Sequence, residues 1–475
     1  MSYLSHTDDE RERMLSEIGI DSIDDLFRDV PEHLRIDQLD IPDGLSEPEV
    51  VRLLTAKAAQ NVNLESRASF LGGGAYLGYV PAAVGAITGR AEFYTSYTPY
   101  QAEVSQGTLQ VIYEFQSMIA LLTSLDVANA SLYDGATAVA EAAAMALNAT
   151  GRDRIAVLDS VNPEYRRVLR TCANGIGYTI DEIAAVGDDE ISSAERLVGP
   201  EHAALVVQNP DFLGRTQSMD PLAQVAHAAG ALFIAVVDPV SLAILAPPGD
   251  YGADIAVGEG QNLGGWLSYG GPYLGFIACT SALQRRLPGR IAGATVDNRG
   301  QRAFVLTLQT REQHIRRERA TSNICTNEAL MALGATIYLA LMGKAGLTRV
   351  ANLALQNAHY AAGRLAEIPG FDLVSRQPFF REFAMTTPIP SHEINRFLFS
   401  RNIIGGLDLA PLYPEELELR NSMLLACTDT TRRADIDELV EAMRELTAPG
   451  DSHAQEPREK SAETVIREKV SGGVS

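Results

Sequence analysis

Residues 232–238 read LFIAVVD, an uninterrupted apolar run that ends in Asp238. Helical patterns separate this run from four similar ones, at residues 155–158, 205–207, 254–257 and 274–278. Continuous rather than alternating apolar runs are typical of strands that are covered on both faces. The sequence therefore predicts an α/β fold with a mainly parallel sheet in its large domain.

The N-terminal region differs from this sheet region in charge. Residues 1–50 hold 15 acidic and four basic side chains, so half of the net charge lies in about a tenth of the chain. Residues 12–20 and 22–27 have the spacing of short amphipathic helices. We therefore expect residues 1–65 to form an acidic helical arm that packs on a larger body.

The C-terminal region gives weaker strand signals. We expect the large domain to cover residues 66–334 and a smaller α+β domain to cover residues 335–448, beginning with a long helix. Strands are predicted there at 371–374 and 423–426. Residues 449–475 mix Gly, Ser, Glu and Lys without apolar periodicity, which predicts a disordered tail.

Composition limits the class of protein. The chain has 475 residues with 61 acidic and 39 basic side chains, a net charge of −22, and 46% of its residues are hydrophobic. This composition excludes disorder of the whole chain and argues against a nucleic-acid partner. The four cysteines lie far apart, without the spacing of a zinc site or a disulfide framework. We expect no metal and reduced thiols.

The N-terminus has neither a basic segment nor an apolar one, so export is not indicated. The longest apolar run, Ala329 to Met342, falls short of the ~18 residues that a membrane span needs. We read it as a buried helix. We therefore expect a cytoplasmic protein without a membrane partner.

Two stretches are candidates for holding a charged ligand. Small residues and Thr137 open a predicted helix after Asp134, where free backbone N–H groups suit an anion. An ordinary helix cap explains the same residues equally well. Asp238 follows the strand at 232–237, where an acid is placed to hold a cation, but it could equally cap the next turn.

A third stretch, GADIAVGEGQN at residues 252–262, follows in order. Taken together, the three stretches resemble the large domain of fold-type I pyridoxal-phosphate enzymes. In those enzymes the Asp pairs with the pyridinium nitrogen, and a lysine in the turn after the third stretch forms the Schiff base. Asn262 stands closest to that lysine position here. The chain's lysines are elsewhere, at Lys57, Lys344, Lys460 and Lys469.

Two longer segments resemble one particular family within this class of enzymes. Residues 70–76 with 94–107, and residues 313–330, are similar to signature stretches of the P-protein of the glycine cleavage system, glycine dehydrogenase (decarboxylating). The resemblance runs to about residue 448. Because the lysine is absent and the chain is short, it resembles subunit 1 of the split, two-gene form.

The resemblance implies a mechanism and a set of partners. Glycine would lose carbon dioxide on pyridoxal phosphate that the second subunit binds covalently, and the aminomethyl group would pass to the lipoyl arm of the H-protein. The two subunits would assemble as a heterotetramer with two copies of each. The T- and L-proteins of the same system would be indirect partners.

This chain would then contribute polar residues to a shared site. Tyr97, Tyr100 and Gln101 lie on a segment stiffened by Pro99, and Arg317 lies in a cationic cluster. A polar subunit contact explains the first segment without catalysis, and a solvated ion-pair face explains the second. The Gly72–Gly74 run indicates either positive φ or a plain turn.

Two rival functions remain open at this stage. A self-sufficient fold-type I transferase would need the lysine that the turn lacks. A binding or regulatory subunit could keep the fold without the chemistry, because a fold alone does not imply a function.

Overall fold

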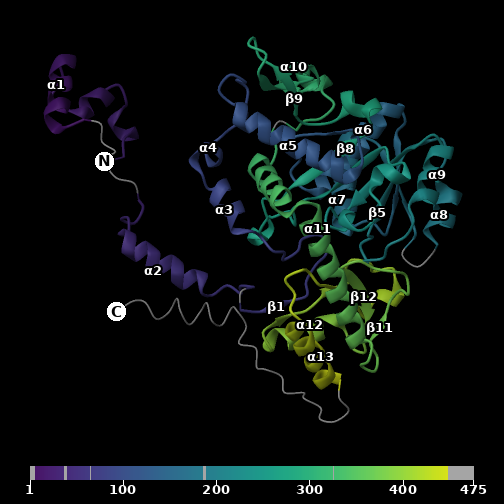
Figure 1. Cartoon of the computed structure of the whole chain (residues 1–475). Helices are drawn as coiled ribbons and strands as arrows, with labels where there is room; N and C mark the ends of the chain where they lie inside the picture. Colours follow the sequence, from purple (N-terminus) through teal and green to yellow (C-terminus); the bar gives the residue numbers. More distant parts are fainter. Residues whose placement is uncertain (1–5, 37–39, 65, 186–188, 325, 448–475) are drawn as a thin grey trace. The chain divides into compact units, whose positions relative to one another are not determined.

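The computed structural model describes residues 6–36, 40–64, 66–185, 189–324 and 326–447, and it divides into two compact units between Asn63 and Leu64 (Figure 1). Each unit is described by itself. The predicted tail at 449–475 lies outside the described residues.

The first unit consists of short helices: α1 (Asp8–Ile18), η1 (Ile23–Phe27), η2 (Glu32–Leu34) and α2 (Glu47–Ala58). Thr7 caps α1, and Gly19 ends it with a left-handed φ of 81°. These two residues explain why the helix predicted at 12–20 begins and ends earlier. Among the described residues of this unit none is buried.

A seven-stranded sheet forms the centre of the second unit, in the order β2-β8-β7-β6-β5-β3-β4. The strands are β2 (Val127–Ala128), β3 (Arg154–Leu158), β4 (Thr179–Ile183), β5 (His202–Asn209), β6 (Leu232–Val237), β7 (Ile255–Glu259) and β8 (Gly275–Cys279). Strands β4, β3, β5, β6 and β7 are parallel, and β8 and β2 run antiparallel to their neighbours. The five apolar runs are all strands of this sheet, which confirms the predicted fold class.

Helices cover both faces of the sheet (Figure 1). One face packs on α6 (Gly135–Thr150) and α7 (Pro163–Ile176), and the other packs on α5 (Gln106–Thr123), α8 (Glu190–Leu197), α9 (Asp220–Ala228) and part of α11. Successive residues of β6 alternate between the two cores, Phe233 and Ala235 on one side and Ile234 and Val236 on the other. Burial of both faces is the reason for the unbroken apolar runs.

A smaller antiparallel sheet lies in the C-terminal part, in the order β11-β12-β15-β14. Its strands are β11 (Asp372–Leu373), β12 (Glu382–Thr386), β14 (Leu407–Asp408) and β15 (Ser422–Ala426), and its core includes residues of α12 (Ser391–Ser400) and α13 (Arg433–Thr447). The N-terminal β1 (Ala68–Ser69) pairs with β13 (Ile403–Ile404). The chain therefore enters the second unit through its C-terminal domain.

Helix α11 (Ala329–Leu365) joins the two cores. Ala332 and Tyr338 pack in the core of the large sheet, whereas Ala358 and Leu365 pack in that of the small sheet. Gly343 interrupts the helix with a positive φ of 56°. By length and composition α11 could cross a membrane, a test that core helices of soluble proteins also pass, and here it contributes buried residues to both cores. The boundary expected at residue 334 falls inside it.

Apart from 3-10 helices, the other described elements of the second unit come before and after the large sheet in the chain. They are α3 (Ala82–Thr88), α4 (Ala91–Tyr94), the hairpin β9 (Ile291–Val296) and β10 (Arg302–Thr307), and α10 (Gln313–Arg316).

The prediction of a mainly parallel sheet left the direction of single strands open, and the strand at 274–278 runs antiparallel, since β8 runs opposite to β7. Helix α11 starts at Ala329, and just before it Asn327 donates its side-chain amide to the Ser131 hydroxyl and the Ala130 carbonyl.

Candidate functional site

Asp238 lies directly after β6 and uses its two carboxylate oxygens differently. Oδ1 accepts the backbone N–H of Val240 at 2.9 Å, which caps the following turn. Oδ2 pairs with the guanidinium of Arg381 at 2.5 Å. Asp238 therefore plays both predicted roles: it caps the following turn, and it binds a cation. That cation is Arg381 of this same chain.

Arg381 is buried, with 3% of its side chain exposed, just before β12 of the small sheet. Its Cζ lies 3.4 Å from the centroid of the Tyr76 ring, in the geometry of a cation–π contact. The neighbouring Glu382 accepts the hydroxyl of Tyr76 at 2.7 Å and the backbone N–H of Gly73 at 2.6 Å. Burial raises the pKa of Glu382.

The glycine run at 72–74 permits this contact with Glu382. A Cβ on Gly72 would collide with the Glu382 carboxylate, and Gly73 and Gly74 have φ values of 88° and 121°. Glycine adopts such conformations without strain. The run therefore provides both close backbone approach and positive φ.

Carboxylates occupy the N-terminus of α6. Asp134 accepts the backbone N–H of Thr137 at 2.7 Å, and the Thr137 hydroxyl contacts the same carboxylate, so Thr137 takes part in an ordinary cap. Glu259, the last residue of β7, accepts the N–H of Gly135 at 2.9 Å. Its other oxygen accepts two more backbone N–H groups, at Gln261 and Leu274. Burial raises the pKa of Glu259 to about 7, although these N–H donors lower it.

The turn after β7 carries Asn262, which is 7% exposed and lies against Gly78. The adjacent Gln261 is 2% exposed, and its side chain accepts the N–H of Tyr76 at 2.9 Å and donates to its carbonyl at 3.1 Å. The turn therefore holds the segment that carries Tyr76. Residues 258–264 contain no lysine.

The cavity between Asp238, Glu259 and Arg381 has a volume of about 40 Å³. This volume holds about one water molecule, whereas typical small-molecule sites have roughly 300–1,000 Å³. The acid that would face a pyridinium already pairs with Arg381, and two carboxylates occupy the helix N-terminus that would face a phosphate. The residues present do not fit pyridoxal phosphate.

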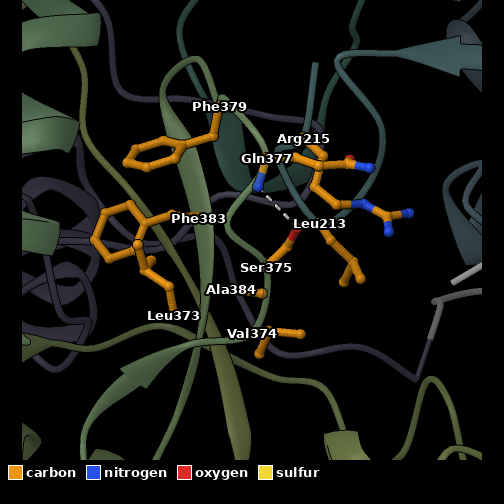
Figure 2. A pocket seen from close by; sticks show the side chains of 9 residues that line it. All are labelled: Leu213, Arg215, Leu373, Val374, Ser375, Gln377, Phe379, Phe383 and Ala384. Atoms are coloured by element: carbon orange, nitrogen blue, oxygen red, sulfur yellow. Dashed lines mark hydrogen bonds between the residues drawn. The ribbon is translucent and has the colours of Figure 1, made fainter. Parts of the chain in front are cut away.

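A neighbouring hollow shows how tightly the two domains of this unit meet. It lies between the loop at 213–215 and the strands β11 and β12, and its volume is about 10 Å³ (Figure 2). Phe379 and Phe383 fill one side, with ring centroids 5.5 Å apart. Such a volume has no room for a ligand.

The two signature segments meet at a second cluster, on the β9 side of the large domain. The hydroxyl of Tyr100 accepts a hydrogen bond from Arg290 at 3.1 Å, and the ring lies edge-on to His314 with centroids 6.2 Å apart. Glu312 lies 3.8 Å from Arg290 and 3.6 Å from His314. Arg290 is 3% exposed, whereas Tyr100 is 53% exposed and presents its ring to the surface.

The other predicted site residues are more exposed. Tyr97 is 75% exposed, and Gln101 is exposed beside it. Arg317 is exposed, has a positive φ of 55°, and lines a groove of about 940 Å³ along α6 and α7. The structure therefore brings Tyr100 to the segment at 313–330 through its ring contact with His314, and places Arg317 at a separate groove.

Residues of these two clusters that were not predicted as site residues include Glu259, Arg290, Arg381 and Glu382. Arg381 and Glu382 had a signal in the sequence, because they are two adjacent charges that open the buried apolar strand β12. Charged residues are almost never fully buried unless they are paired. The sequence therefore predicts that Arg381 and Glu382 have buried charged or polar partners, but it does not identify those partners.

The central sheet, with an acid after β6 and the small-residue helix α6 packed on one face, has the large-domain fold of the fold-type I pyridoxal-phosphate enzymes. The family model described as "Glycine cleavage system P-protein" matches residues 1–443. The chain belongs to the glycine cleavage system P-protein family.

Individual relatives agree with this family. A protein of Moorella thermoacetica named "Probable glycine dehydrogenase (decarboxylating) subunit 1" is 52% identical over 94% of this chain and 100% of its own length. A crystal structure of glycine decarboxylase (P-protein) of the glycine cleavage system, in inhibitor-bound form, is 45% identical, with a TM-score of 0.85 over 94% of this chain and 100% of that one.

A more distant structure shows the fold alone. A sphingosine-1-phosphate lyase of Burkholderia pseudomallei is 14% identical, with a TM-score of 0.61 over 86% of this chain and 92% of that one.

Proposed function

We propose that this chain is the subunit of a two-subunit glycine decarboxylase that does not bind the cofactor. The second subunit would hold pyridoxal phosphate through its own Schiff-base lysine. Glycine would be decarboxylated there, carbon dioxide would leave, and the aminomethyl group would pass to the lipoyl group of the H-protein.

One observation carries this proposal: in a chain of the P-protein family, Asp238 is paired with the buried Arg381 and the turn at 258–264 has no lysine. An arginine cannot replace the lysine as an amine, because its guanidinium stays protonated. The relatives named subunit 1 support a second subunit, since that name implies another gene product.

The contribution of this chain would come from its exposed polar segments. Tyr97, Tyr100 and Gln101 would border the active site of the second subunit and donate or accept hydrogen bonds there. The buried Arg290 would hold the Tyr100 hydroxyl in place through its 3.1 Å hydrogen bond. Arg317 would attract an anionic group of the cofactor or of the lipoyl-bearing protein.

The proposed assembly is a heterotetramer with two copies of each subunit, acting with the H-protein directly and with the T- and L-proteins indirectly. We propose a cytoplasmic location. An interface larger than the ~1,600 Å² of a standard complex is expected, because the pair would be permanent.

The test is to purify this chain alone, the second subunit alone, and both together, and to measure glycine–bicarbonate exchange and aminomethyl transfer to the H-protein. Light scattering on a sizing column reports assembly in the same samples. We expect both activities in the mixture and neither with this chain alone. Full activity of the second subunit alone would instead favour a regulatory role, and activity of this chain alone would favour a self-sufficient transferase.

A further inference from the structure

We infer that Arg381 and the Glu259 carboxyl occupy, within this chain, the places of the two charged groups that a bound cofactor would bring, and that Arg381, through its ion pair with Asp238, latches the large and small domains together. This inference does not depend on the proposed catalytic role. It concerns a pocket whose residues are all in this chain.

Arg381 provides the positive charge. Its guanidinium lies 2.5 Å from Asp238 and stacks on the ring of Tyr76, as a flat cationic ring would do between the same groups. Asp238 is 13% exposed. A carboxylate at that depth needs a partner cation, because burial without one is strongly unfavourable.

Glu259 provides the negative charge. The helix α6 already has a complete cap from Asp134 and Thr137, so Glu259 is a second carboxylate at the same end. It accepts the N–H of Gly135, the first residue of the helix, where the helix dipole favours an anion. A Cβ on Gly135 would contact the hydroxyl of Tyr165 and the Cβ of Glu259, which shows how closely these groups approach.

The latch follows from where these residues lie in the two sheets. Asp238 directly follows β6 and Glu259 ends β7 of the large sheet, whereas Arg381 directly precedes β12 of the small sheet and Glu382 begins it. Just before β12, Thr216 donates its backbone N–H to Pro378 at 2.7 Å. The Asp238–Arg381 ion pair is therefore a second link between the two domains, beside the backbone hydrogen bond from Thr216 to Pro378.

The experiment uses pyridoxine 5′-phosphate, which has no aldehyde and so cannot react with surface lysines. Binding to the full chain is measured by equilibrium dialysis for the wild type and for the double variant Arg381→Ala/Glu259→Ser. We expect binding to tighten by about tenfold or more, because each freed charge-assisted hydrogen bond is worth about one factor of ten.

The matched control is Arg167→Ala/Glu164→Ala, which removes one charge of each sign from an exposed ion pair on α7. It should bind like the wild type. The inference is overturned if the folded double variant binds no more tightly than the wild type, or if the control gains the same affinity.

A thermal unfolding cycle keeps the inference testable if the double variant fails to fold. Asp238→Asn and Arg381→Met are compared singly and together by their Tm values. A latch predicts that each single change lowers Tm, and that the two together lower it by clearly less than the sum of the single losses. Additive losses would overturn it.

Discussion

Replacing Tyr100 by Phe tests whether this chain contributes to a shared active site. The change removes one hydroxyl and keeps the ring that packs 5.4 Å from Arg290 and 6.2 Å from His314. Among the described residues, the Tyr100 hydroxyl accepts a hydrogen bond from Arg290 at 3.1 Å. The hydroxyl proton can therefore point to a ligand outside this chain.

The two possible roles differ in magnitude. Loss of one partly exposed hydrogen bond to Arg290 should lower the free energy of unfolding by about 0.5–1.5 kcal/mol. Loss of a donor that acts mainly in the transition state should raise the barrier by about 2–4 kcal/mol, or roughly 30- to 1000-fold in rate. We expect the larger effect on turnover and the smaller one on stability.

The assay is glycine–bicarbonate exchange and aminomethyl transfer by the assembled complex, with light scattering to show that assembly is unchanged. Tyr269→Phe is the control, because this tyrosine is 92% exposed on a different loop. Wild-type rates for Tyr100→Phe in an intact complex would refute the catalytic reading and leave a scaffold role.

Three further predictions follow from other sites. Arg317→Ala and Tyr97→Phe should each lower the rate of glycine–bicarbonate exchange by roughly 30-fold or more without dissociating the complex. Unchanged rates would mean that neither side chain takes part in catalysis. Burial, and then the charge of Asp211, raises the pKa of Glu190 from 4.5 to about 7. The stability that its neutral form contributes is complete below pH 4.5 and is lost as pH rises through 7. Urea unfolding should therefore show the wild type losing about 3 kcal/mol relative to Glu190→Gln across that range, and parallel pH profiles would contradict this. Finally, borohydride reduction of this chain after incubation with pyridoxal phosphate should give no stoichiometric adduct at any single residue, including the turn at 258–264; peptide mapping checks this.

The sequence predicts the buried part of the sheet well, because burial on both faces leaves a simple apolar pattern. It does not predict β4, whose residues Asp181 and Glu182 pair with Arg154 and Arg166 at the sheet edge. These consecutive residues point to opposite faces of the sheet, so this edge strand has ion-paired charges on both faces and no continuous apolar run. The two-residue β2 is too short to give a pattern of its own.

The site was predictable only in part, for a different reason. Asp238 and the start of α6 follow from local pattern, since each lies at the end of a regular element. Arg381 is 143 positions further along the chain than Asp238, and no local spacing relates the two. The same holds for Tyr100 and Arg290, which meet only after β9 and β10 are folded against α5.

The low burial of side chains in the first unit affects how readily proteases cut the chain. Its helices bury no side chain among the described residues, and Ile18, Leu26 and Phe27 remain more than half exposed. Short helices that bury little apolar surface open easily and expose their backbone to proteases. We expect proteases to cut the chain in this unit first, and limited proteolysis with mass mapping of the fragments checks this.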